Sequence, residues 1–397
     1  MRLSRLTPKA WSVMSALHMR GEASRSQLTV DTGLPWATLS RTVDELSAYG
    51  LLEETRMGRV GKAGPQSVLL RVNGEAGYLF GIDVGATNIK VAAMNLALQP
   101  MNFSFPMLQT GKNVEEVIQN IRTCVREILM AVDANDILGI GLGWPGAVDY
   151  VQGIAQWSPN IQGYSELAVK DMLSEEQLRT LGEVPIVIDH DTECTALAEK
   201  EIGNHGRPRT QQNFLCVTVG TGVGAGLVHN GSVFRGARNY AGEIGHFLVN
   251  ETASIKCGCG RVGCLEKEIS GPDLARKWRE RNPDSLITAE QIARLAHEGD
   301  SNAIALFREM GRWLGRALSY CVNLNNYELI ILNGAVSGSF DLFSPSLKNE
   351  LSERAFRSSL LGLRIEATSV GTNAAAFGAA ISVLDHFKTL PYSGRGR

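Results

Sequence analysis

A cluster of cysteines and one histidine limits what this chain can fold into more than any other feature. Its members are His246, Cys257, Cys259 and Cys264. Three thiolates and one imidazole are the ligand set of a closed tetrahedral Zn²⁺ site, and the glycines between the cysteines let the backbone turn tightly enough for the sulfur atoms to meet. Two carboxylates, Glu243 and Glu266, flank the cluster. We predict a structural zinc ion here; the alternative is a glycine-rich loop whose reduced cysteines bind nothing.

Length and composition indicate a multidomain protein of the cytoplasm. A chain of 397 residues exceeds what one hydrophobic core usually organises, so two or three domains are expected. Hydrophobic residues make up 44% and charged residues 20%, which is typical of a soluble globular protein. We expect no membrane insertion, because no long apolar run is present and residues 1–7 lack the apolar segment of a signal peptide. Seven cysteines, three of them clustered, favour a reducing compartment over a disulfide framework.

Residues 1–72 predict a separate DNA-binding domain. This segment contains ten Lys or Arg and six Asp or Glu, a net charge of +4, whereas the rest of the chain carries −6. Apolar residues at helical spacing predict a first helix over residues 8–19. Ser24 and Gln27 predict a capping box for a short second helix that ends at Gly33. A short helix followed by a glycine-containing turn and a further helix indicates a helix-turn-helix motif.

A third helix and a basic loop supply the candidate DNA contacts. The helix opens at Leu34-Pro35, and its polar face is placed to enter a major groove. Strands expected at residues 51–55 and 67–71 enclose a basic tip, residues 56–65, which suits a wing that contacts phosphate or a minor groove. The candidate contacts are Ser26, Trp36, Thr38, Ser40, Arg41, Arg59 and Lys62. The alternative is a three-helix protein-interaction module with a solvated basic loop.

The rest of the chain alternates predicted strands and helices, which indicates an α/β architecture. Two of the strands run into glycine-containing turns whose backbone N–H groups are suited to binding phosphate. The residues of these turns are Asp83, Gly85 and Thr87 in the first, and Gly220, Thr221, Gly222 and Gly224 in the second. Each turn is also compatible with an ordinary β-turn that binds nothing. Two such turns suggest two similar lobes around a cleft.

Two polar segments are candidates for binding a small molecule. Asp191 follows a buried strand over residues 184–188 and has His190 beside it, so it can act as a general base toward a hydroxyl or as a hydrogen-bond acceptor. An N-capping role for the following helix fits equally well. Asn160 lies in a polar loop that is typical of a ligand pocket and also of a surface turn.

These motifs together resemble the ROK family (repressors, open reading frames and sugar kinases) over residues 78–385. The family pattern Cys-x-Cys-Gly-x-x-Gly-Cys-x-Glu matches Cys257 to Glu266, and Glu-x-Gly-His matches Glu243 to His246. The resemblance implies an actin-like, hexokinase-type ATPase fold with a sugar between the lobes. The implied sugar contacts are Asn160, His190, Asp191, Glu243, His246 and Glu266. It also implies that His246 ligates zinc, and that Asp191 is the catalytic base if the chain is a kinase.

We therefore expect three domains. The first is a winged helix-turn-helix domain at 1–72. The second is a first α/β lobe at 76–193, completed by an alanine-rich helix within 372–388 that packs back on it. The third is a second α/β lobe at 194–371 that contains the zinc site.

The N-terminal domain favours the repressor branch of the family, which includes regulators that respond to xylose, glucose and N-acetylglucosamine. Family kinases usually carry Asn-Asp-Ala-Asn where this chain has His190 to Glu193, and a Gly-Gly pair where it has Gly334-Ala335. We predict a sugar-responsive repressor of carbohydrate-utilisation genes that binds operator DNA as a homodimer or higher oligomer. The alternatives are a sugar kinase that uses ATP and Mg²⁺ and carries a DNA-binding domain, and a regulator sequestered by a sugar-transporter subunit.

Overall fold

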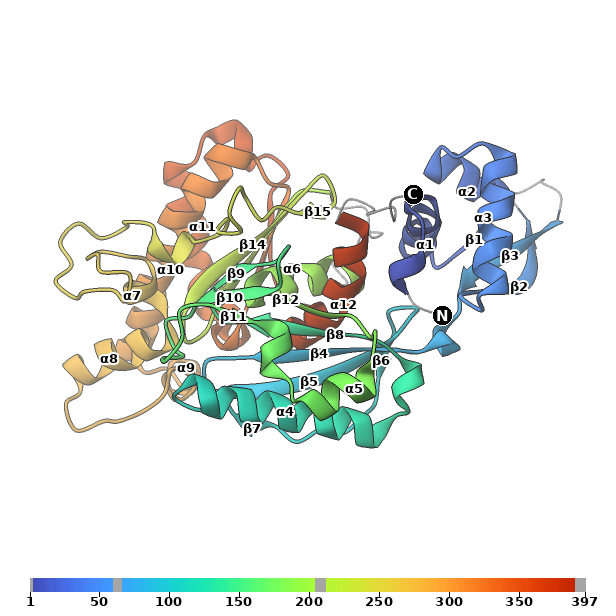
Figure 1. Cartoon of the computed structure of the whole chain (residues 1–397). Helices are drawn as coiled ribbons and strands as arrows, with labels where there is room; N and C mark the ends of the chain where they lie inside the picture. Colours follow the sequence, from blue (N-terminus) through green and yellow to red (C-terminus); the bar gives the residue numbers. More distant parts are fainter. Residues whose placement is uncertain (1–2, 60–65, 204–211, 390–397) are drawn as a thin grey trace. The chain divides into compact units, whose positions relative to one another are not determined.

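The chain forms two compact α/β units (Figure 1), and the computed structural model describes residues 3–59, 66–203 and 212–389 of it. The first unit comprises Met1–Ile202 and Ala375–Arg397, and the second comprises Gly203–Ala374. Helix α6 (Asp191–Ile202) therefore belongs to the first unit, whereas the sequence boundary at 193/194 assigned most of it to the second lobe. A search of the described helices finds none that is both long and apolar enough to cross a membrane.

The N-terminal domain consists of three helices and a three-stranded sheet with the order β1-β3-β2. Its elements are α1 (Pro8–Arg20), β1 (Glu22–Ser24), α2 (Arg25–Thr32), α3 (Trp36–Ala48), β2 (Leu52–Arg59) and β3 (Gln66–Val72). The predicted capping box is confirmed, because the Ser24 side chain accepts from the Gln27 N–H and the Gln27 side chain accepts from the Ser24 N–H. Gly33 ends α2 with a φ of 66°, which favours glycine. Strand β1 was missed because three residues show no alternation.

The predicted apolar face of α3 forms part of the core of this domain. Leu39, Val43 and Leu46 are all buried, and α3 packs against α1 and α2. Helix α1 also contacts the first lobe within the same unit. The Trp11 ring stacks on Phe387 with centroids 5.9 Å apart, and His18 Nε2 lies 2.8 Å from the carbonyl oxygen of Leu96.

The first lobe is built on a sheet with the order β12-β8-β4-β5-β6, and β7 pairs with β5. The strands are β4 (Tyr78–Val84), β5 (Asn88–Asn95), β6 (Pro100–Met101), β7 (Leu108–Gln109), β8 (Ile137–Trp144) and β12 (Ile186–His190). Strands β4, β8 and β12 are parallel, whereas β4 and β5 form an antiparallel hairpin. Helix α4 (Val114–Ala131) buries the apolar stripe that the sequence predicted, including Val117, Ile121 and Val125. The remaining elements are β9 (Ala147–Asp149), β10 (Ile154–Trp157), β11 (Leu167–Ala168) and α5 (Glu175–Leu181).

Helix α12 (Ala374–Thr389) packs against this sheet at backbone distance because glycines line the contact. A Cβ atom added at Gly81 of β4 would lie 1.8 Å from the carbonyl oxygen of Ala376. One added at Gly141 of β8 would lie 1.7 Å from the carbonyl oxygen of Ala379. The expectation that the C-terminal helix packs back on the first lobe is therefore confirmed.

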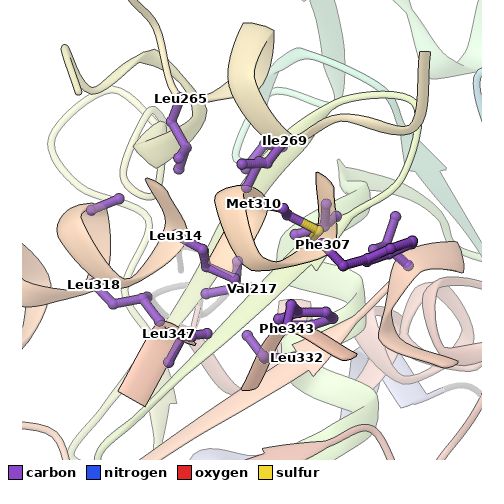
Figure 2. Packing of buried hydrophobic residues seen from close by; sticks show 14 of the residues in the cluster. Val217, Leu265, Ile269, Phe307, Met310, Leu314, Leu318, Leu332, Phe343 and Leu347 are labelled. Atoms are coloured by element: carbon purple, nitrogen blue, oxygen red, sulfur yellow. The ribbon is translucent and has the colours of Figure 1, made fainter. Parts of the chain in front are cut away.

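The second unit contains a sheet with the order β15-β14-β13-β16-β17. The strands are β13 (Phe214–Val219), β14 (Val223–His229), β15 (Ser232–Val233), β16 (Leu329–Asn333) and β17 (Arg364–Ala367). The helices are α7 (Glu266–Ile269), α8 (Gly271–Arg281), α9 (Ala289–His297), α10 (Ser301–Asn325) and α11 (Phe340–Arg354). Figure 2 shows the core of this unit, in which Phe307 and Leu314 of α10 and Phe343 of α11 pack with Val217 of the sheet.

Candidate functional site

The four residues predicted to bind metal converge in the second unit. One ligand atom from each of His246, Cys257, Cys259 and Cys264 lies within 4.8 Å of all the others. The Cys259 and Cys264 sulfur atoms are 3.6 Å apart, and the Cys257 Sγ lies 3.7 Å from His246 Nδ1. Ligands at a Zn–S distance of about 2.3 Å in a tetrahedron are about 3.8 Å apart, so this donor set fits a zinc-sized ion.

Local backbone geometry holds the three cysteines together. The Cys257 N–H donates to the Arg261 carbonyl at 2.7 Å, and the Gly260 N–H donates to the Cys257 carbonyl at 2.9 Å. Gly260 and Gly263 have φ values of 89° and 86°, which side chains rarely adopt. A Cβ atom at Gly263 would also lie 2.2 Å from the carbonyl oxygen of Asn250. These two glycines are therefore required for the turn that brings Cys257 and Cys264 together.

The neighbouring cysteines shift the pKa values of one another's thiol groups, and a bound cation would stabilise their thiolate forms. Burial raises the pKa of the Cys264 thiol to about 12, and the neighbouring Cys259 adds to this effect. For Cys259, burial acts to raise the pKa, but hydrogen bonds from the backbone and side chain of Arg261 outweigh it and lower the pKa to about 6. A divalent cation would favour the thiolate form of all three cysteines.

Glu266 connects the metal cluster to the second glycine turn. Its Oε1 atom lies 3.7 Å from the Cys257 Sγ, and its Oε2 atom accepts a hydrogen bond of 3.2 Å from the Val223 N–H. A Cβ atom at Gly222 would lie 3.0 Å from Oε2, so the glycine leaves room for this carboxylate. The turn itself joins the antiparallel strands β13 and β14, and the Gly220 N–H donates to the Gly222 carbonyl at 2.9 Å. Glu266 is thus a structural link within the second unit as well as a predicted sugar contact.

His246 offers a different nitrogen on each side of its ring. It ends the short helix η5 (Ile244–His246), and its Nδ1 atom faces Cys257. Its Nε2 atom lies 3.7 Å from Glu243 Oε2. Metal binding through Nδ1 would leave Nε2 as an N–H donor, because a neutral imidazole carries one proton. This geometry is compatible with the two roles that the family resemblance implied for His246.

In the first unit, acidic residues meet at the carboxyl edge of the parallel strands. Asp83 of β4 and Asp189 of β12 both pair in register with Gly143 of β8, which lies between them. Burial raises the pKa of the Asp83 carboxyl to about 7; the charge of Asp191 adds to this effect and Lys90 opposes it. Ligands of open α/β sheets bind at this edge.

A hydrogen-bonded group follows at the start of α6. His190 Nδ1 lies 2.5 Å from Glu193 Oε2, and His190 Nε2 lies 3.4 Å from Asp191 Oδ1. Burial raises the pKa of Asp191, and the charge of His190 opposes that rise. Sequence reasoning missed Glu193 as a functional residue. The available signal was an acid three positions after a histidine, at the point where the strand passes into a helix.

Other predicted residues occupy surface positions. Asn160 is exposed, and its N–H donates to Ser158 Oγ at 3.2 Å. In the first glycine turn, the Gly85 N–H donates to the Asn88 carbonyl at 3.0 Å, and the Asn88 side chain donates to Thr87 Oγ1 at 3.2 Å. This turn closes the β4–β5 hairpin.

The candidate DNA contacts that the structure describes lie on α2 and α3. Ser26, Trp36 and Arg41 are exposed, while Thr38 and Ser40 are half-buried. Trp36 is 56% exposed. Lys62 and the side chain of Arg59 lie outside the described part of the chain.

The two α/β units, the acidic sheet edge and the thiol–imidazole cluster define an α/β protein of the actin-like, hexokinase-type fold, preceded by a small helical domain. The chain matches the ROK family over residues 79–386 and belongs to that family. The xylose repressor of Caldicellulosiruptor bescii is 26% identical over 93% of both chains.

Solved structures agree with this assignment. A ROK family transcriptional regulator, described as a homologue of the Escherichia coli MLC protein, superposes with a TM-score of 0.80 at 22% identity over 96% of both chains. The ROK family glucokinase of Streptomyces griseus, solved with glucose and AMPPNP, gives a TM-score of 0.63 at 26% identity. That comparison covers 77% of this chain and 98% of the kinase, so it leaves about the length of the N-terminal domain unmatched.

Proposed function

We propose that this protein is a sugar-responsive transcriptional repressor of carbohydrate-utilisation genes. The observation that carries the proposal is the extent of the similarity. A repressor matches over 93% of the chain and a transcriptional regulator over 96%, whereas a kinase matches over 77%. The kinase match leaves about a quarter of this chain uncovered, which is room enough for the basic N-terminal domain, whereas the regulators match almost the whole chain. DNA binding is the function that best explains why the chain carries this N-terminal domain.

Operator binding would rest on the winged helix-turn-helix domain. The segment 1–72 has a net charge of +4, and α3 exposes Trp36 and Arg41. Such a helix would enter the major groove, while Arg59 and Lys62 of the wing would contact phosphates. We further propose a homodimer on a two-fold operator, because paired half-sites are the usual target of this kind of domain.

The residues proposed to contact the sugar effector are those that the family resemblance implied. Asn160, His190 and Asp191 belong to the first unit, and Glu243, His246 and Glu266 belong to the second. A zinc ion on His246 and the three cysteines would fix the loop that carries these second-unit side chains, so that fewer rotamers are lost when the sugar binds. A coupling free energy of about 1–3 kcal/mol between sugar and DNA would change operator affinity about 5–150-fold.

The proposal is tested by measuring operator affinity against a panel of sugars. Fragments bound by the purified protein would first be selected from genomic DNA, and fluorescence anisotropy would then follow their release by pentoses, hexoses and N-acetylated hexosamines. We expect one sugar class to weaken binding at least fivefold, and Arg41→Ala to weaken binding without changing that response. Unchanged affinity with every sugar would overturn the effector role.

A second candidate function is a sugar kinase. The glucokinase of Halalkalibacterium halodurans is 29% identical over 76% of this chain, and the proposed ATP and Mg²⁺ site would include the Asp83 and Gly220 turns beside Asp191 as base. ADP release on the sugar panel, abolished by Asp191→Asn, would support this function. A third possibility is sequestration by a sugar transporter. If free sugar does not change operator affinity and no ADP is released, release of the operator by membranes that contain a sugar-transporter subunit would support sequestration.

A further inference from the structure

The segment from His190 to Glu193 contains a charged group that the proposed function does not use. Glu193 is 1% exposed, although carboxylates are rarely buried without a partner. Its Oε2 atom lies 2.5 Å from His190 Nδ1 and accepts a hydrogen bond of 2.9 Å from the Thr192 hydroxyl. His190 is the last residue of β12, and Thr192 lies on the first turn of α6. The buried carboxylate is therefore directed at the imidazole of His190.

This contact determines which nitrogen of His190 carries the proton. The Thr192 hydroxyl oxygen also lies 2.6 Å from Nδ1, but its proton is donated to Glu193. Both oxygen atoms around Nδ1 therefore accept from the ring, which requires a proton on Nδ1. The opposite nitrogen, Nε2, lies 3.4 Å from Asp191 Oδ1. A lone pair and a carboxylate oxygen repel each other at this distance, so a proton on either Nε2 or Asp191 is needed between them.

The surrounding charges favour keeping that proton. Asp189 precedes His190 at the end of β12 and is buried, and the charges of Asp83 and Asp191 act on each other. Lys90 is the cation that acts on Asp83. Acids packed on one sheet edge raise one another's affinity for protons, so His190 and Asp191 together hold a proton rather than exposing a fully ionised Asp191.

We propose that Glu193 is a positioning residue that fixes His190 with Nδ1 protonated, so that His190 and Asp191 act as a hydrogen-bonding pair for adjacent hydroxyl groups of the sugar. The pair offers one donor and one acceptor side by side, which suits a vicinal diol. Because the shared proton occupies Asp191 in part, the pair binds a hydroxyl better than it removes the hydroxyl's proton. This inference rests on the proposed function, since it concerns the same sugar site.

The first test measures which ring nitrogen of His190 is protonated, in the absence of sugar. Nitrogen-15 chemical shifts of the histidine rings in the full-length protein report which ring nitrogen is protonated. We expect a protonated Nδ1 in the wild type and a loss of that state in Glu193→Gln. Glu199→Gln is the matched control, because Glu199 is a buried acid of the same helix at 3% exposure. If Glu193→Gln does not fold, Glu193→Asp shortens the carboxylate arm and should change the His190 shifts in the same direction.

The second test is a double-mutant cycle on sugar affinity, measured by calorimetry with the sugar that releases the operator. Glu193→Gln and His190→Asn should each weaken binding roughly tenfold, as the loss of a charged hydrogen bond does. The double variant should bind no more weakly than His190→Asn, because Glu193 acts through His190. Additive losses, or unchanged nitrogen shifts in Glu193→Gln, would overturn the inference while the repressor proposal stands. If no sugar binds the wild type, the proposed effector role fails, and the nitrogen shifts alone still decide whether Glu193 sets the protonation of His190.

Discussion

Replacing Asp83 by asparagine should stabilise the first unit, and the gain should depend on pH. Burial raises the pKa of Asp83 from 3.8 to about 7. In the folded chain the carboxyl therefore keeps its proton up to about pH 7, whereas in the unfolded chain it loses the proton above its ordinary pKa. Unfolding releases a proton in this window, so the free energy of unfolding falls as the pH rises from about 4 to 7 and is level above that.

The size of the effect follows from the shift. One pKa unit corresponds to about 1.4 kcal/mol, so a shift of about 3 units gives an upper bound of about 4 kcal/mol at pH 8. Asparagine has nearly the same shape and never ionises. Relative to the wild type, Asp83→Asn should therefore gain stability between pH 4 and 7 and keep the gain at pH 8.

The assay must follow the first unit alone, because a chain of two units need not unfold in one step. The protein would be titrated with urea at pH 4 to 8 and then labelled by a hydrogen-exchange pulse at one fixed pH. Mass spectrometry of peptides from β4 would then measure the fraction of the first unit that is unfolded. Asp171→Asn, a change at an exposed acid, is the control and should leave the profile unchanged. Identical pH profiles for Asp83→Asn and the wild type would refute the reasoning.

Further predictions concern packing and the metal. Gly141→Ala should destabilise the first unit by about 3 kcal/mol or more in urea unfolding, because its Cβ would lie 1.7 Å from the carbonyl of Ala379. Gly338→Ala, which has nothing within 4 Å and no positive φ, should change the stability of the second unit by less than about 1 kcal/mol, and equal losses in both variants would contradict the packing argument. Elemental analysis should find one zinc ion per chain, and Cys264→Ser should lower that content. Chelation should lower the melting temperature of the wild type and added Zn²⁺ should restore it; a melting temperature insensitive to chelation would exclude a structural role.

The part of the site that sequence could predict is the part made from neighbouring residues. The cysteine spacing identified a cluster whose donor atoms lie within 4.8 Å of one another. The capping box of α2 was likewise predicted from Ser24 and Gln27, and the structure has it. These features depend on spacing along one short segment, so tertiary contacts did not change them.

What the sequence could not predict depends on distances between segments far apart in the chain. The carboxylate of Glu266 accepts from the N–H of Val223, 43 residues earlier, and no local pattern encodes that contact. Asp83 and Asp189 flank Gly143 because β8 lies between β4 and β12, an order set by strand pairing. The position of α12 depends on the missing side chain of Gly141, which sequence shows only as one more glycine.

The sequence by itself thus determined the family, the α/β class and the spacing of the candidate metal ligands, since each is carried by residue type and local spacing. The tertiary structure alone decided which acids share one sheet edge, that Glu193 faces His190, and that helix α6 packs with the first unit. The physical reason is that burial and strand pairing fix the electrostatic environment of a side chain, and both arise only when distant segments pack together.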